Sequence, residues 1–223
     1  DETWDEWIQL GDFMDFDQIS KFNKDSPGLI AGRSLDGDYE IANKLLDRHQ
    51  AIVRKRNKNA KFTMLEGNHD LRVEKLVEHQ PQLKGSVEVE QRLRLKERGI
   101  TWVRCYYKGE LYKLGKAYFH HGLYVTPNHA KKMVDSFGVN VFYGHTHDVQ
   151  MHSKVQWGKD KTLVGQSCGC LCRFDLSYIG ENPSNWINAF LVFYFRPNGS
   201  FTYYVVQMFD NSFVAPNGKL YTP

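Results

Sequence analysis

Val141-Phe142-Tyr143-Gly144-His145-Thr146-His147 is an apolar run that leads through a glycine into two imidazoles. A short apolar run of this kind is typical of a buried strand, and the glycine suits a tight turn at its end. Two histidines presented together after such a strand are typical of a metal site. The stretch therefore predicts a strand whose carboxyl end offers His145 and His147 as metal ligands.

Two upstream stretches repeat this order of short strand, glycine and ligand-type side chains. They are Trp7-Ile8-Gln9-Leu10-Gly11-Asp12-Phe13-Met14-Asp15 and Phe62-Thr63-Met64-Leu65-Glu66-Gly67-Asn68-His69-Asp70. A further predicted strand, from Ala117 to His120, runs into His121-Gly122. Side chains alternate along a strand, so His120 should face away from His121 and be a packed or hydrogen-bonded histidine rather than a ligand.

Length and composition indicate an ordinary globular protein. The 223 residues fit one domain over residues 1–223, with 41% hydrophobic and 25% charged residues. The 29 basic and 26 acidic residues leave a formal charge of +3, which is too small to indicate nucleic-acid or membrane binding by itself. The sequence shows no apolar run of the roughly 18 residues that a membrane span needs and no N-terminal leader, so a cytoplasmic protein with no membrane partner is predicted.

The periodicity of apolar residues predicts helices and strands in alternation over the first two thirds of the chain. A long surface loop is predicted from Asp17 to Asp38. The predicted helices run from Tyr39 to Asn57, Leu71 to Gln80, Ser86 to Arg98 and Asn128 to Phe137. The other predicted strands run from Trp7 to Leu10, Lys61 to Leu65, Thr101 to Cys105, Glu110 to Leu114, Leu163 to Gly165, Ala189 to Phe195 and Phe201 to Met208. We therefore expect an α/β fold with two sheets packed face to face, helices outside, and a C-terminal hairpin turning at Asn198-Gly199.

Three of the four cysteines, Cys168, Cys170 and Cys172, alternate in one short apolar segment. Alternation on a strand would place the three thiols on one face. Their spacing does not match the Cys-x-x-Cys knuckle of structural zinc sites, so buried, reduced thiols are predicted.

Four motifs in order, Gly11-Asp12-x-x-Asp15, Gly67-Asn68-His69-Asp70, His121-Gly122 and Gly144-His145-x-His147, resemble those of the calcineurin-like metallophosphoesterases. The C-terminal hairpin and the Ser184-Asn185-Trp186 approach to it are similar to phage-type members of that family. The resemblance implies a four-layer α-β-β-α sandwich with two divalent metal ions at the strand ends. Manganese, iron and zinc all suit such ligands, and manganese is preferred.

The resemblance also assigns roles to single residues. It implies that Asp12 bridges both metals, that Asn68, His121 and His145 complete the second metal's ligands, and that His147 belongs to the first metal. A hydroxide shared by the two cations would attack phosphorus.

The catalytic residues implied in the same way are His69, which would protonate the leaving group, and Asp15, which would orient the His69 ring. Arg72, three residues after His69, could bind a phosphate oxygen of the substrate. The alternative for Arg72 is an exposed helical arginine.

One family motif has no counterpart in the chain. Family members begin with a strand that ends in Asp-x-His, and no such motif precedes Gly11. Asp47-Arg48-His49 has the letters but lies in a predicted helix. We therefore expect a further N-terminal segment in the native gene product, on the order of 20 to 30 residues for a strand plus a helix.

The predicted function is that of a dinuclear metal-dependent phosphoesterase. Phe16 stands where eukaryotic-type protein phosphatases have an arginine, which favours phosphodiester, nucleotide or nucleic-acid substrates over phosphoproteins. Action on DNA ends would need a basic groove, for which Lys21, Lys24 and Arg33 are the candidates. The alternatives are a protein phosphatase and a catalytically impaired member that binds a protein partner.

Overall fold

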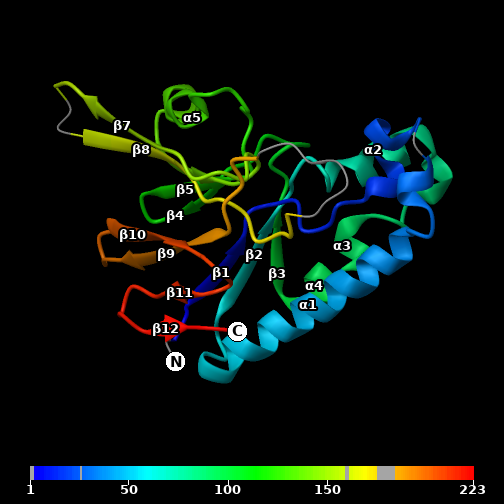
Figure 1. The fold of residues 1–223 in the computed structure, drawn as a ribbon, viewed down its shortest axis with the longest axis horizontal. Coiled ribbons are helices and arrows are strands. Elements are labelled where there is room, and N and C mark those ends of the chain that lie inside the picture. Colours follow the sequence, from blue (N-terminus) through cyan, green and yellow to red (C-terminus); the bar gives the residue numbers. More distant parts are fainter. Residues whose placement is uncertain (1–2, 26, 159–160, 175–183) are drawn as a thin grey trace. The chain divides into compact units, whose positions relative to one another are not determined.

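The computed structural model describes residues 3–25, 27–158, 161–174 and 184–223, which form a mixed α/β protein with several sheets and few helices. The chain divides into two compact units, residues 1–110 and 111–223 (Figure 1).

The helices, with η for 3₁₀, are η1 (Asp17–Ile19), η2 (Lys21–Asn23), η3 (Pro27–Ile30), α1 (Leu35–Arg56), α2 (Leu71–His79), η4 (Pro81–Leu83), α3 (Val89–Arg92), α4 (Leu95–Arg98) and α5 (His129–Phe137). The strands are β1 (Glu6–Gln9), β2 (Lys61–Leu65), β3 (Ile100–Val103), β4 (Tyr112–Leu114), β5 (Ala117–His120), β6 (Asn140–Tyr143), β7 (Met151–Gln156), β8 (Lys161–Ser167), β9 (Ala189–Phe195), β10 (Phe201–Gln207), β11 (Phe213–Val214) and β12 (Leu220–Tyr221).

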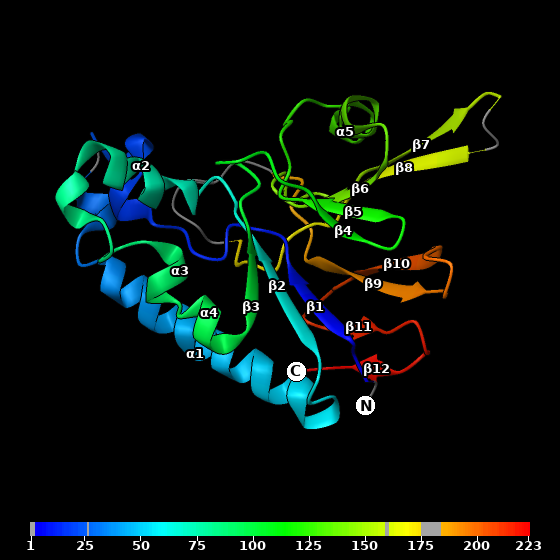
Figure 2. The same cartoon turned by 180° about the vertical axis from the view of Figure 1, so that it is seen from behind.

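The first unit contains a parallel sheet in the order β1-β2-β3. Helix α1 packs its buried face, which includes Tyr39 and Leu46, in one cluster with Phe62 and Met64 of β2. The Ser34 hydroxyl caps this helix by accepting a hydrogen bond from the Gly37 N–H at 3.1 Å. Because the three strands run parallel, their carboxyl ends share one edge of the sheet, as Figure 2 shows from behind.

In the second unit, five strands form a sheet in the order β4-β5-β6-β8-β7, with β5, β6 and β8 parallel. Residues on opposite faces of β6 pack differently, as strand alternation requires. Val141 and Tyr143 contact α5, whereas the ring of Phe142 lies 4.7 Å from that of Phe193 on β9 and 4.9 Å from that of Tyr203 on β10. Strands β9 and β10 pair antiparallel, so the predicted hairpin is confirmed.

A buried ion pair closes the end of β2. The carboxylate of Glu66 is fully buried and accepts hydrogen bonds from Arg104 Nε at 2.9 Å and from the N–H groups of Tyr106 and Tyr107 at 3.0 and 2.7 Å. The same guanidinium lies 3.0 Å from Glu74 on α2. Glu66 therefore joins the end of the central strand to the loop that follows β3.

Replacing Glu66 with Ala should lower the free energy of unfolding by about 3–5 kcal/mol, because Arg104 Nε and the N–H groups of Tyr106 and Tyr107 lose their acceptor, and a buried donor without a partner costs about 1–3 kcal/mol. Glu74 still pairs with the other side of the Arg104 guanidinium. The matched control is Glu40→Ala on α1, since Glu40 and its partner Lys44 are both mostly exposed, and a change within about 0.5 kcal/mol is expected there. Urea denaturation of both variants measures the difference. Equal effects of the two substitutions would contradict the structural role of Glu66.

Two predictions in the first unit were wrong. The single helix from Ser86 to Arg98 is instead the pair α3 and α4, because Arg94 adopts a left-handed conformation with φ 52°. The Arg98 side chain donates a hydrogen bond to the Leu93 carbonyl at 2.9 Å, which stabilises this break. The predicted loop from Asp17 to Asp38 contains three 3₁₀ helices, and α1 begins at Leu35.

The cysteine segment also differs from the prediction. Strand β8 ends at Ser167, and Gly169 has a φ of 72°, so Cys168, Cys170 and Cys172 do not alternate on one strand face. These three thiols are partly exposed and Cys105 is buried, and none of the four forms a disulfide. Among the helices within the described ranges, none is long and apolar enough to cross a bilayer.

Candidate functional site

The loops that follow β1 and β2 are joined by two carboxylates. Asp12 Oδ1 accepts a hydrogen bond from the His69 N–H at 2.8 Å. The buried carboxylate of Asp70 accepts from the N–H groups of Asp12 and Gly67 at 3.0 and 2.8 Å. These bonds hold Asp12 in a left-handed conformation with φ 53°. No role for Asp70 was predicted from the sequence.

Gly67 is required for this close approach of the two loops. A Cβ atom at Gly67 would lie 2.1 Å from Asp12 Oδ1 and 2.3 Å from the Asp12 nitrogen. Gly67→Ala should therefore lower the free energy of unfolding by about 1–3 kcal/mol, the usual cost of inserting an atom into a packed site. Gly28→Ala is the control because a Cβ there meets nothing within 4 Å. Denaturation midpoints that move equally in both variants would show that the loops can separate freely.

His69 lies between two carboxylates of the first unit. Its Nδ1 atom is 3.4 Å from Asp15 Oδ1, and its Nε2 atom is 3.9 Å from Asp12 Oδ2. At 3.4 Å the contact between the His69 ring and the Asp15 carboxylate is longer than an ordinary hydrogen bond. The proximity of the His69 ring holds the pKa of Asp15 below its usual value. Asn68 lies partly exposed on the same loop, one residue before His69.

Arg72 on α2 contacts the segment that follows β1. Its Nη1 atom donates a hydrogen bond to the Asp15 carbonyl at 2.6 Å and lies 3.4 Å from Asp17 Oδ1. Its side chain is only 16% exposed, so the alternative of an exposed helical arginine was wrong. Binding of substrate by Arg72 stays a prediction. Asp17 also pairs with Arg33 at 2.5 Å, so the charge of that predicted basic residue is already neutralised.

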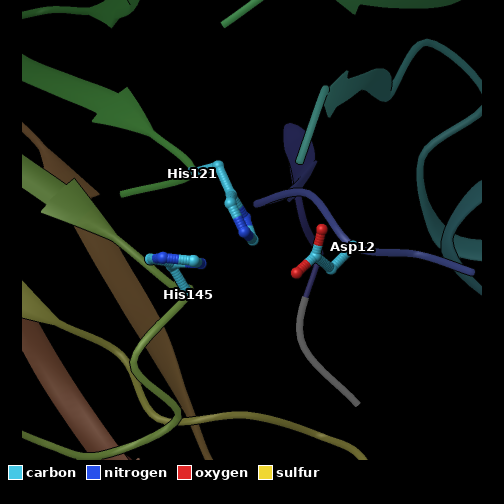
Figure 3. A group of neighbouring side chains, drawn as sticks. All are labelled: Asp12, His121 and His145. Atoms are coloured by element: carbon cyan, nitrogen blue, oxygen red, sulfur yellow. The ribbon is translucent and has the colours of Figure 1, made fainter. Parts of the chain in front are cut away.

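In the second unit, the loops after β5 and β6 bring two histidines together. The rings of His121 and His145 lie with their centroids 5.0 Å apart, and Figure 3 shows both projecting from these loops. The Gly144 N–H donates to the His121 carbonyl at 2.8 Å, which joins the two loops. Gly122 has a φ of 130°, and a Cβ there would lie 2.7 Å from the Cβ of His145. The predicted pairing of His121-Gly122 with Gly144-His145 thus has a direct steric reason.

His147 contacts a tryptophan in the second unit. Its ring stands perpendicular to that of Trp186 with the centroids 4.1 Å apart. The His147 carbonyl accepts a hydrogen bond from the Ile187 N–H at 2.9 Å. Trp186 was noted in the sequence only as part of the approach to the hairpin, and its contact with His147 had no sequence signal.

His120 is packed and hydrogen-bonded, as predicted. It is buried, its Nδ1 atom accepts from the Gly122 N–H at 2.9 Å, and its ring lies 5.4 Å from that of Phe137 on α5. The two adjacent histidines at the end of β5 therefore differ in role, because only His121 meets His145.

The donor types at the two sets of loops suit a divalent transition metal. Carboxylate, amide and imidazole groups together are acceptable to manganese, iron and zinc. Soft thiolate ligands, which would favour other metals, do not belong to either set of loops.

Comparisons with known proteins give one distant similarity. The chain matches no protein-family profile, and no solved structure matches it. It is similar to the "Gene 54 protein" of Mycobacterium phage D29, with 26% identity over 200 residues that cover 83% of this chain and 75% of that protein. The name of this phage protein describes no activity.

Proposed function

We propose that this protein is a metal-dependent phosphoester hydrolase of the calcineurin-like type, with the four-layer sandwich of that family. One observation carries the proposal. Ligand-type side chains follow the carboxyl ends of two parallel strand pairs, β1 with β2 and β5 with β6. Loops at the carboxyl ends of parallel strands are the usual place for ligand sites in α/β proteins.

In the proposed site, the carboxylate of Asp12 and the imidazoles of His121 and His145, the three side chains labelled in Figure 3, would hold a divalent cation. Asn68 and His147 are the further proposed ligands, so that two cations, with manganese preferred, are held. When bound, the cations would supply Lewis-acid stabilisation of phosphate oxygens and a hydroxide at neutral pH.

The residues of the first unit would handle the proton on the leaving oxygen. His69 Nδ1 lies toward Asp15 and its Nε2 atom lies on the side of Asp12. We infer that Asp15 holds the ring so that Nε2 donates its proton to the departing oxygen. The hydrogen bond from the His69 N–H to Asp12 joins the loop of this donor to the loop of the proposed ligand.

The environment of Phe16 supports phosphodiester or nucleotide substrates. Phe16 is fully buried and its ring lies 5.2 Å from that of Tyr39. This position therefore belongs to the hydrophobic core and offers no cation to a phosphoprotein. A protein phosphatase is the less favoured alternative for this reason.

The proposal is tested with bis-para-nitrophenyl phosphate, para-nitrophenyl phosphate and single-stranded DNA in the presence of manganese. We expect turnover of at least one phosphodiester and loss of this turnover in the His121→Ala, His145→Ala double variant. Metal analysis should give nearly two equivalents per chain. No turnover of any substrate together with a metal-free protein after purification with manganese would overturn the proposal and favour the protein-binding alternative.

A further inference from the structure

A buried histidine outside the proposed ligand set joins the two ends of the loop that carries His145 and His147. His129, the first residue of α5, places Nδ1 2.6 Å from the Tyr143 hydroxyl and Nε2 3.0 Å from Asp148 Oδ2. The side chain of His129 is 4% exposed and that of Asp148 is 23% exposed. Tyr143 is fully buried.

The chemistry of the three groups fixes the direction of these hydrogen bonds. A carboxylate only accepts, so His129 Nε2 carries the proton that is donated to Asp148. In the neutral ring the Nδ1 atom then accepts from the Tyr143 hydroxyl. Both ring nitrogens are thus satisfied, as a buried imidazole requires.

The two partners of His129, Tyr143 and Asp148, lie at opposite ends of one loop. Tyr143 is the last residue of β6, and Asp148 directly follows His147. The His129 ring therefore bridges the two ends of the loop formed by residues 144–147. The Asp148 carbonyl is fixed in addition by the Gly169 N–H at 2.9 Å and by the Ser167 hydroxyl at 2.9 Å.

The loop needs such restraint because its backbone is strained. His145 and His147 both have left-handed conformations, with φ of 69° and 62°. A non-glycine residue in this region carries a conformational cost and keeps the conformation only when its surroundings impose it. Within the loop itself, the Thr146 N–H to Gly144 carbonyl bond of 2.8 Å is short-range and cannot fix the ends.

We propose that His129 is a positioning residue that clamps residues 144–147 in the conformation that sets His145 beside His121. The contribution to the loop holds whatever the protein binds. The contribution to metal binding rests on the proposed function.

The first test measures amide hydrogen exchange in the metal-free protein by NMR. His129→Phe keeps a ring but removes both hydrogen bonds, and His129→Gln can keep only the bond to Asp148. We expect the Gly144 and Thr146 amides to exchange about 10-fold faster or more in His129→Phe, less so in His129→Gln, with β9 and β10 unchanged. A local opening of this kind is expected where restraints are lost without global unfolding.

Two further variants make this result decisive. His152→Phe, a histidine of β7 in the same unit, is the matched control and should leave the loop amides unchanged. If His129→Phe does not fold, amide exchange is measured in Tyr143→Phe instead, since this substitution removes only a hydroxyl. Loop exchange equal to that of the wild type in the folded clamp variant overturns the proposal.

The second test separates the clamp from the proposed function. Calorimetric titration with manganese should show about 10- to 100-fold weaker binding in His129→Phe, the usual effect of losing a group that orients ligands. A wild-type protein that binds no manganese would overturn the proposed function, while the exchange experiment would still decide on the clamp. Equal manganese affinity and equal loop exchange in wild type and variant would overturn the clamp alone.

Discussion

His69→Ala is expected to lower the turnover of a dinucleotide substrate by about 10²- to 10⁴-fold while leaving the manganese content unchanged, the usual scale for loss of a general acid. The ring lies between Asp12 and Asp15 and is not among the proposed ligands. Its removal therefore takes away the proposed proton donor and leaves the carboxylate of Asp12, the proposed metal ligand, in place. His79→Ala, at the exposed end of α2, is the control.

The dependence on the leaving group makes this prediction specific. A nitrophenolate departs readily without a proton, whereas a nucleoside alkoxide needs one. The loss of turnover should therefore be much smaller with bis-para-nitrophenyl phosphate than with the dinucleotide. Equal losses on both substrates would show that His69 acts by another route, such as binding the substrate.

Asp12→Asn is expected to abolish turnover and to weaken manganese binding more than about 100-fold, beyond the effect of losing an orienting group. The substitution removes the negative charge but keeps the shape of the side chain. Asparagine tolerates a left-handed backbone, and its oxygen can still accept the hydrogen bond from the His69 N–H. The folded structure should therefore remain while the cation is lost.

Thermal unfolding with and without manganese measures this result. Bound metal should raise the melting temperature of the wild type, because a ligand that binds only the folded state stabilises it. The melting temperature of Asp12→Asn should not respond to manganese, whereas Asp36→Asn, a largely exposed carboxylate on α1, should respond like the wild type. A full response of Asp12→Asn would remove Asp12 from the ligand set.

Strands that are short, largely apolar runs were predictable from the sequence. The structure has β2, β5 and β9 at the predicted boundaries, and α5 ends at Phe137 as predicted, followed by Gly138 in the left-handed conformation. Strand β7 was missed because it lies at the edge of its sheet and most of its residues are exposed. An exposed edge strand carries little apolar periodicity, so its sequence resembles that of a loop.

For the candidate site, the motifs identified residues but not their partners. The proximity of His121 and His145 could be predicted because the resemblance to the metallophosphoesterases gives both to one metal, and in the structure they follow adjacent parallel strands. The contacts of Arg72 with Asp15 and of His129 with Asp148 could not, because they join residues from loops and helices whose approach depends on the whole fold. The left-handed conformation of Arg94 could not be predicted from the sequence either, because glycine and asparagine are the residues that usually indicate this conformation.

The left-handed backbone at Asp12, His145 and His147 has a consequence for laboratory evolution. Glycine fits these positions with less conformational cost than the native side chains, so a screen that rewards heat resistance or expression yield alone would enrich for it there. Such a screen would yield stable variants that lack the proposed metal ligands. A mutagenesis library that is screened for higher stability should therefore keep these three codons constant and vary positions in the helices instead.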